Sequence, residues 1–240
     1  SQPKIMITEP QLTEIRNYLL AKKLPIDILI EINDHFVSQI LDLQREENLG
    51  FVEAFEKTKL SWKPELRMVY NPNYSLDDIS ILMKKIVYTE TIRLFKQSFI
   101  ITFSTILFLF LLSWQFSEKI FLYSFTSLSF LVILIPVFQY FSNLKDFRLI
   151  KKYDNYRLTF YQNYATLTLV LLGSYLQFFF HLKTFSSMLY NSFKFLHYDY
   201  LYYSSIPLFA LLFILNIYCY LNQKKYLIQI QKVKPFLKYL

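Results

Sequence analysis

Two groups of residues in this chain carry side chains that can do acid–base or metal chemistry. The first is Glu31, Asp34 and His35, in which Glu31 and His35 stand four residues apart and therefore share one face of a helix. A metal site needs three or more converging ligands, and two acids with one histidine on a single short helix do not supply that arrangement. We expect instead a hydrogen bond between His35 and an acid inside a helical bundle.

The second group is His181, His197 and Asp199, which follow the third of four apolar stretches. Together they could hold an ion and act on a lipid, but a loop so rich in aromatic residues also carries histidines by composition alone, so no metal is predicted. The chain has no G-x-S-x-G turn, Walker loop, glycine-rich dinucleotide turn or C-x-x-C pair. With two glycines in 240 residues it lacks the usual loops that cradle phosphates, so we expect no cofactor and no enzymatic activity.

Four apolar stretches of nearly uncharged residues dominate the C-terminal two-thirds of the chain. A helix rising ~1.5 Å per residue needs about 20 residues to cross a hydrocarbon core ~30 Å thick, which matches their lengths. The predicted membrane spans are residues 98–115, 120–141, 163–182 and 205–221, within a transmembrane domain of residues 98–222.

Ionisable side chains are absent near the centres of these spans, where they would be the default sign of transport or catalysis. A proton-coupled transporter is therefore disfavoured. Serine and threonine at this depth can bond to their own helix, and Asn216 is predicted to join two helices. The single cysteine, Cys219, also lies in the last span and is expected to be buried and inert. The polar residues within the spans are Ser104, Thr105, Ser127, Thr166, Thr168, Ser174 and Asn216.

Basic residues gather in alternate gaps between the spans. Fourteen lie before the first span, between the second and third, and after the fourth, whereas the other two gaps hold three. This asymmetry predicts that both termini are cytoplasmic. The residues expected to meet lipid headgroups are Lys84, Lys85, Arg93, Lys96, Arg148, Lys151, Lys152, Lys224 and Lys225.

The first 80 residues are acidic, with 13 acidic and 9 basic residues against a chain that is +8 overall. Because the basic residues flank membrane spans rather than cover a soluble surface, nucleic-acid binding is excluded as a function class. Periodic apolar residues predict three short helices here, over residues 8–22, after Pro25 to about Glu47, and 52–60. The middle helix carries the clearest apolar stripe, namely Leu29, Ile32, Phe36, Ile40 and Leu43.

The remaining boundaries follow from composition. Residues 1–62 form the predicted head, and prolines and asparagines mark residues 63–74 as a linker. Ser75, with Asp78 three residues on, is predicted to begin an amphipathic juxtamembrane helix over residues 75–97. Because no helix terminator follows, this helix is expected to continue into the first span or to lie nearly in line with it. Residues 223–240 are predicted to form a basic cytosolic tail.

The head resembles the small helical cytosolic domain called HAAS, and the heads of uncharacterised multi-span membrane proteins of flavobacteria and their relatives. The resemblance is carried by Leu24-Pro25, by Glu31-x-x-Asp34-His35-Phe36, and by Gly50-Phe51-x-Glu53-Ala54-Phe55. It covers residues 8–62, about a quarter of the chain. It implies a signalling or permease-linked role, in a family often associated with PadR-like transcriptional regulators, and it implies no catalytic residue.

Together these patterns predict an all-α integral membrane protein with four transmembrane helices and a small N-terminal three-helix cytosolic domain. We expect a multi-pass protein of the bacterial cytoplasmic (inner) membrane that acts as a non-enzymatic interaction or regulatory subunit. Its head would bind a cytosolic protein through the face bearing Glu31, Asp34 and His35, while its spans pack in the phospholipid bilayer against a membrane protein complex or further copies of itself. A small transporter, channel or permease component is the alternative.

Overall fold

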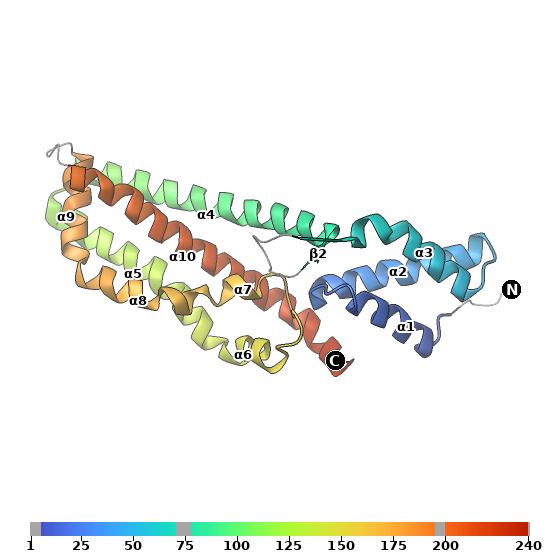
Figure 1. Ribbon diagram of the computed structural model, residues 1–240. Coiled ribbons are helices and arrows are strands. Elements are labelled where there is room, and N and C mark those ends of the chain that lie inside the picture. The colour runs from blue at the N-terminus through green and yellow to red at the C-terminus, as the bar shows by residue number, and fades with distance from the viewer. Residues whose placement is uncertain (1–5, 71–77, 195–199, 240) are drawn as a thin grey trace. The chain divides into compact units, whose positions relative to one another are not determined.

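The computed structural model describes residues 6–70, 78–194 and 200–239, and this part of the chain is almost entirely helical (Figure 1). It divides into two compact units. The first comprises Ser1–Glu90, Ile150–Phe160 and Ile228–Leu240, and the second comprises Thr91–Leu149 and Tyr161–Leu227. The elements are α1 (Glu9–Leu20), α2 (Ile26–Glu46), α3 (Phe51–Leu66), β1 (Met68–Val69), β2 (Ile79–Ser80), α4 (Ile81–Gln115), α5 (Glu118–Ser142), α6 (Leu144–Lys152), α7 (Gln162–Ala165), α8 (Leu167–Phe180), α9 (Leu182–Phe193), α10 (Tyr200–Val233) and a final 3₁₀ turn, η1 (Lys234–Tyr239).

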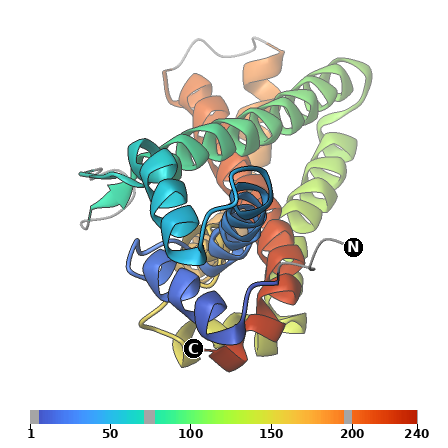
Figure 2. The same cartoon turned by 90° about the vertical axis from the view of Figure 1, so that its right-hand side faces the viewer.

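The first unit is built on a three-helix head, whose helices face the viewer in blue and cyan in Figure 2. The predicted stripe of α2 is confirmed, because Leu29, Ile32, Phe36 and Ile40 are buried at spacings of three and four residues. Helix α1 contributes Ile15 and Leu19, which are fully buried in the same core. Aromatic contacts fix the three helices together, since the ring of Tyr18 lies 6.0 Å from Phe36 of α2 and 5.9 Å from Phe55 of α3.

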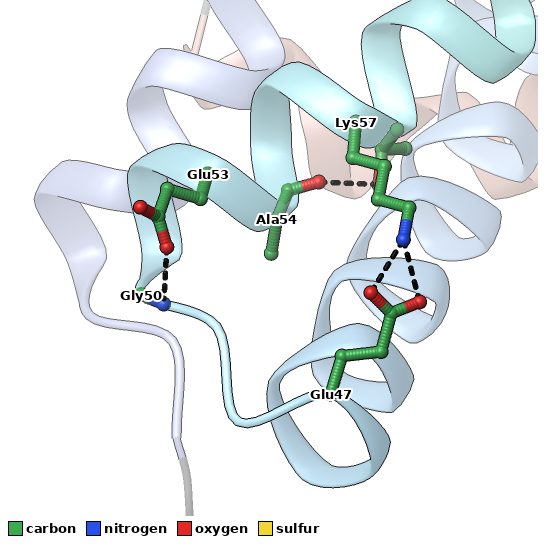
Figure 3. Close-up of polar contacts among 6 residues, drawn as sticks. Glu47, Gly50, Glu53, Ala54 and Lys57 are labelled. Atoms are coloured by element: carbon green, nitrogen blue, oxygen red, sulfur yellow. Dashed lines mark hydrogen bonds and ion pairs between the residues drawn. The ribbon is translucent and has the colours of Figure 1, made fainter.

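The turn between α2 and α3 is held by polar contacts that Figure 3 shows. Gly50 begins α3, and its backbone N–H donates a long hydrogen bond of 3.4 Å to the Glu53 carboxylate. Lys57, two turns into α3, contacts both carboxylate oxygens of Glu47 at the end of α2. The Gly50-x-x-Glu53 spacing thus closes the helix start with a side chain from its own first turn.

Helix α3 corrects the expected end of the head. The sequence predicted a helix over residues 52–60 followed by a linker over 63–74, but α3 begins at Phe51 and continues through Pro64 to Leu66. Leu66 is 2% exposed and packs in the head core, and its burial stabilises the extra turn. Pro64 lies in the last turn of α3 and has no N–H to donate to the carbonyl of Leu60, so α3 continues past it with one helical hydrogen bond fewer. Val52, in the first turn of α3, is 69% exposed.

The expected start of the juxtamembrane helix was also wrong. Residues 79–80 form β2, which pairs antiparallel with β1 (Met68 opposite Ser80, Val69 opposite Ile79), and α4 begins only at Ile81. Ser75 lies outside the described residues, and Asp78 is exposed ahead of the strand. The hydroxyl of Ser80 accepts a hydrogen bond of 3.1 Å from the N–H of Met83, so Ser80 supplies the cap that had been assigned to Ser75.

Helix α4 is continuous for 35 residues, from Ile81 to Gln115. At ~1.5 Å per residue its length is about 52 Å, longer than the ~30 Å that a hydrocarbon core requires. The sequence left open one continuous helix or two nearly in line, and the structure has one.

The fold class predicted from the sequence is confirmed. Apart from the short β1–β2 pair, the regular elements of the described residues are helical, with an N-terminal three-helix domain and three helices long and apolar enough to cross a membrane, or four if a bent pair forms one span. The bent pair is Gln162–Phe180 with Leu182–Phe193, which meet at an angle of 73°. The predicted third span, residues 163–182, corresponds to α7 and α8, which separate at Thr166, and its predicted end lies at the bend that follows Phe180.

Within the second unit, α8 and α9 both pack on α5 (Figure 1). Leu189, Tyr190 and Phe193 of α9 are buried there, with the ring of Tyr190 5.4 Å from Phe121 of α5. Ser187 donates a 2.7 Å hydrogen bond to Glu118, and the Tyr190 hydroxyl donates one of 3.2 Å to the carbonyl of Phe116. These contacts hold α9 against the connection between α4 and α5.

The last helix corrects the expected basic tail. Helix α10 does not end near Leu221 but continues to Val233 and passes into η1, so Lys224 and Lys225 lie on a helix. Its apolar positions Tyr226, Ile230 and Val233 are fully buried, which explains why the helix persists beyond the apolar stretch.

Candidate functional site

The predicted partner-binding face lies on the surface of α2. Glu31, Asp34 and His35 are all exposed, so the hydrogen bond expected between His35 and an acid inside the bundle is wrong. The imidazole lies beside the indole of Trp62 on α3, with ring centroids 6.4 Å apart. The four-residue spacing does place Glu31 and His35 on one face of α2. That face points away from the core, because Ile32 and Phe36 occupy the buried side of the helix.

The N-terminus of α2 is the most heavily constrained point of the first unit. Pro25 precedes this helix and has no side-chain acceptor, so the first backbone N–H groups of α2 need partners from elsewhere. The carbonyl of Arg157 accepts from the N–H of Ile26 at 2.8 Å, and the carbonyl of Leu158 accepts from the N–H of Asp27 at 3.2 Å. The segment between α6 and α7 therefore caps a helix more than a hundred residues away in sequence.

The side chain of Asp27 completes this contact. One carboxylate oxygen accepts from the N–H of Ile28 at 3.0 Å, and the other accepts from the N–H of Phe160 at 3.3 Å. Burial raises the pKa of Asp27 from 3.8 to about 7, although the backbone donors, chiefly Phe160 N–H, act in the opposite direction. Asp27 thus ties the head to residues 157–160 and titrates near neutral pH. We call this contact the α2 cap: Ile26 and Asp27 with residues 157–160.

The C-terminal end of the chain forms a second contact with the head. The guanidinium of Arg16 on α1 lies 4.2 Å from the ring centroid of Tyr239 and 5.5 Å from that of Phe236. Phe236 also packs against the apolar core of the head. Figures 1 and 2 both show η1, in red, beside the dark blue α1. The first unit is therefore completed by two segments that the sequence had assigned to other parts of the protein.

In the second unit, buried polar side chains of α8 and α10 form hydrogen bonds with one another, and we call this set of contacts the polar seam. The hydroxyl of Tyr175 donates to the side-chain oxygen of Asn216, whose amide nitrogen donates to its own helix at the carbonyl of Leu212, 2.8 Å away. Asn216 is fully buried, and this contact is of the kind expected of it from the sequence.

One and two turns further along α10, the seam continues. Gln223 donates to the hydroxyl of Thr168 at 2.7 Å, and the Cys219 sulfur lies 2.8 Å from that same hydroxyl. Each of these side chains is fully buried. They form a structural hydrogen-bond network between helices, with no carboxylate or histidine in it that could move a proton.

The basic residues expected at lipid headgroups are distributed over three helices. Lys84, Lys85, Arg93 and Lys96 are exposed along the first half of α4, and Arg148, Lys151 and Lys152 are exposed on α6. On α10, Lys224 is exposed and Lys225 is partly covered. Exposure leaves their charges available to anionic headgroups.

The second group of candidate ligands is not assembled by the described residues. His181 is exposed at the bend between α8 and α9, while His197 and Asp199 lie outside the part of the chain that the structure describes. Within that part, no three histidine, cysteine or acidic side chains converge as metal ligands.

Several functional residues had been missed. Asp27 looked like an ordinary first-turn acid, and the signal that could have singled it out is Pro25, which leaves the helix without a side-chain cap. Tyr175 and Gln223, which join α8 to α10, were also overlooked, although a buried amide needs a hydrogen-bond partner.

Comparison of the chain with known protein families, characterised proteins and solved structures finds no match. The likeness of the head to HAAS domains remains a prediction, and function has to be argued from the geometry of the chain itself.

Proposed function

We propose that this chain is a non-enzymatic regulatory or interaction subunit of the bacterial cytoplasmic membrane, with both termini in the cytoplasm. Its head would bind a cytosolic protein, and this binding would change the conformation of the membrane helices. The observation that carries the proposal is the α2 cap, in which Ile26 and Asp27 bond to residues 157–160.

The cap supports coupling because it adds to the covalent connection through α4. A head joined only through α4 could bind a partner without affecting the rest of the chain. Here the head also holds the segment between α6 and α7 by backbone hydrogen bonds, and η1, which follows α10, through Arg16. A partner that shifts α2 must therefore either carry these segments along or break their contacts.

The partner surface is the exposed face of α2 with Glu31, Asp34 and His35. Two carboxylates beside an imidazole and the Trp62 indole suit a basic protein surface with an apolar element. The basic residues between the spans support the cytoplasmic position of this face.

The test is co-purification of the tagged full chain from its native membranes in a mild detergent. We expect a stoichiometric cytosolic partner, which is lost in the double variant Glu31→Lys/Asp34→Lys. The matched control is Asp42→Lys/Glu46→Lys, since these two acids are also exposed on α2 but lie toward its other end. Retention of the partner in the first variant, or an equal loss in the control, would contradict the assignment of the face.

The transport alternative predicts solute flux across liposomes that contain the purified chain alone. The seam of Tyr175, Asn216, Thr168, Cys219 and Gln223 carries no charged side chain, which favours the regulatory role over a charged transport pathway. Measurable flux would reverse this preference.

A further inference from the structure

A groove of about 570 Å³ lies between α8 and α10, where α8 reaches the bend at His181. Its floor consists of phenylalanine rings from α8, α9 and α10. The residues at its rim and walls are Gly173, Ser174, Gln177, His181, Leu208 and Leu212. The volume is within the range of small-molecule sites, ~300–1,000 Å³.

One wall of the groove is polar, although α8 is otherwise an apolar helix. Ser174, Gln177 and His181 follow one another at spacings of three and four residues, so they form a row on one face. Among the described residues, none of these three side chains has a hydrogen-bond partner. An unpaired amide in hydrocarbon is costly, so the row favours an occupant that brings hydrogen-bonding groups.

The chemistry of the row selects the kind of group. A serine hydroxyl, a glutamine amide and a neutral imidazole can each donate a hydrogen bond. Each can also accept one, so the occupant needs polar groups beside this row, for which acceptors alone suffice, and apolar groups against Leu208 and Leu212. A diacyl phospholipid has these properties, because ester carbonyls connect its phosphate to its hydrocarbon chains.

The dimensions of the groove favour an acyl chain over a helix from another protein. From His181 to Gly173 the groove follows eight residues of α8, about 12 Å. A packed helix needs small residues over several turns for close approach. Only Gly173 and Ser174 meet that need, and the exposed residues around them, Leu176 and Phe180, are large. A Cβ added at Gly173 would meet no atom within 4 Å, so the groove is open at its inner end.

We propose that this groove binds one phospholipid, with an acyl chain along Leu208 and Leu212 and its ester carbonyls accepting hydrogen bonds from Gln177 and His181. The site is separate from the head and is independent of the partner proposed above. It gives the membrane bundle a means of responding to the lipid around it.

The test uses tryptophan fluorescence quenched by a brominated phosphatidylglycerol added to the full chain in detergent. Trp62 and Trp114 are first changed to phenylalanine. A reporter is then placed either at the groove, Leu208→Trp, or elsewhere on α8, Leu176→Trp. We expect saturable quenching at the groove, with one lipid per chain, and only weak quenching proportional to lipid at the control position.

Two variants examine the walls of the groove. Gly173→Leu fills the inner end and should weaken saturable quenching about tenfold. Gln177→Leu keeps a similar size and should abolish a preference for ester-linked over ether-linked lipid, and it serves as the second variant if Gly173→Leu does not fold. Leu176→Phe, on the lipid-facing side, is the matched control and should change neither result.

Quenching that is equal at both reporter positions and proportional to the amount of lipid would overturn the proposal, because lipid that surrounds the chain without a specific site produces this result. Self-association that Gln177→Leu abolishes, without saturable quenching, would also overturn it and would identify a second copy of the chain as the occupant.

Discussion

Replacing Asp27 with asparagine should remove a large part of the pH dependence of head stability. The pKa of Asp27 is about 7 in the folded head and 3.8 when the chain is unfolded. Between these values the folded state binds more protons than the unfolded state, so the free energy of unfolding falls as the pH rises. The slope is about 1.4 kcal/mol per pH unit, which gives a loss of roughly 4 kcal/mol between pH 4 and pH 7.

The cause of this loss is burial of a carboxylate at the α2 cap. Asparagine keeps the shape of the side chain and one acceptor but cannot ionise, so the slope due to position 27 should vanish. Loss of the acceptor for the N–H of Phe160 should lower the free energy of unfolding by about 1 kcal/mol at every pH. This loss shifts the plot of stability against pH but does not change its slope. The variant should therefore be more stable than the parent throughout pH 5 to pH 8, and this difference should grow with pH to about 3 kcal/mol at pH 8.

The measurement is urea unfolding of the full chain in detergent at four values between pH 5 and pH 8. Trp62 reports on the head, because its ring packs 5.3 Å from Phe36 in the head core, and Trp114→Phe removes the other indole. Asp34→Asn is the control, since Asp34 is exposed on the same helix and should leave the slope unchanged.

Parallel stability curves for the parent and Asp27→Asn would refute the reasoning. That result would mean that the carboxylate is solvated or paired at neutral pH, and that the α2 cap does not respond to protonation.

Three further predictions concern other contacts. Tyr175→Phe should lower the stability of the second unit by about 1–2 kcal/mol, because Asn216 loses its donor in an apolar setting; thermal unfolding in detergent measures this, and Tyr123→Phe, at an exposed position, should have no effect. Arg16→Gln and Tyr239→Ala should each cost about 0.5–1 kcal/mol in urea unfolding of the head, and less than the sum when combined, because they remove one shared cation–π contact; full additivity would argue against that contact. Lys57→Ala breaks an exposed ion pair with Glu47 and should cost under ~1 kcal/mol, whereas Phe55→Ala, in the head core, should cost about 3–5 kcal/mol; similar losses from the two would contradict this account of what stabilises α3.

The sequence predicted those features that depend on local pattern. The stripe from Leu29 to Ile40 identified the buried face of α2 because helix periodicity brings such residues together whatever surrounds them. The membrane spans could be predicted because the length and polarity of a segment are properties of the segment itself. The predicted end of the third span at residue 182 lies at the bend near His181, although neither proline nor glycine marks that bend. That bend accompanies the packing of Leu189 and Phe193 against other helices.

By itself, then, the sequence determined the helical class, the apolar segments long enough to cross a membrane, and the grouping of Glu31, Asp34 and His35 on one helix. Only the tertiary structure decided that residues 157–160 cap α2, that Asp27 is partly buried there, and that Tyr175 meets Asn216. The physical reason is that hydrophobicity and periodicity are properties of residues close together in the sequence. The hydrogen-bond partner of a polar group, in contrast, can come from any segment that the fold brings near it. Asp27 and Phe160 are separated by 133 residues, and no local pattern relates them.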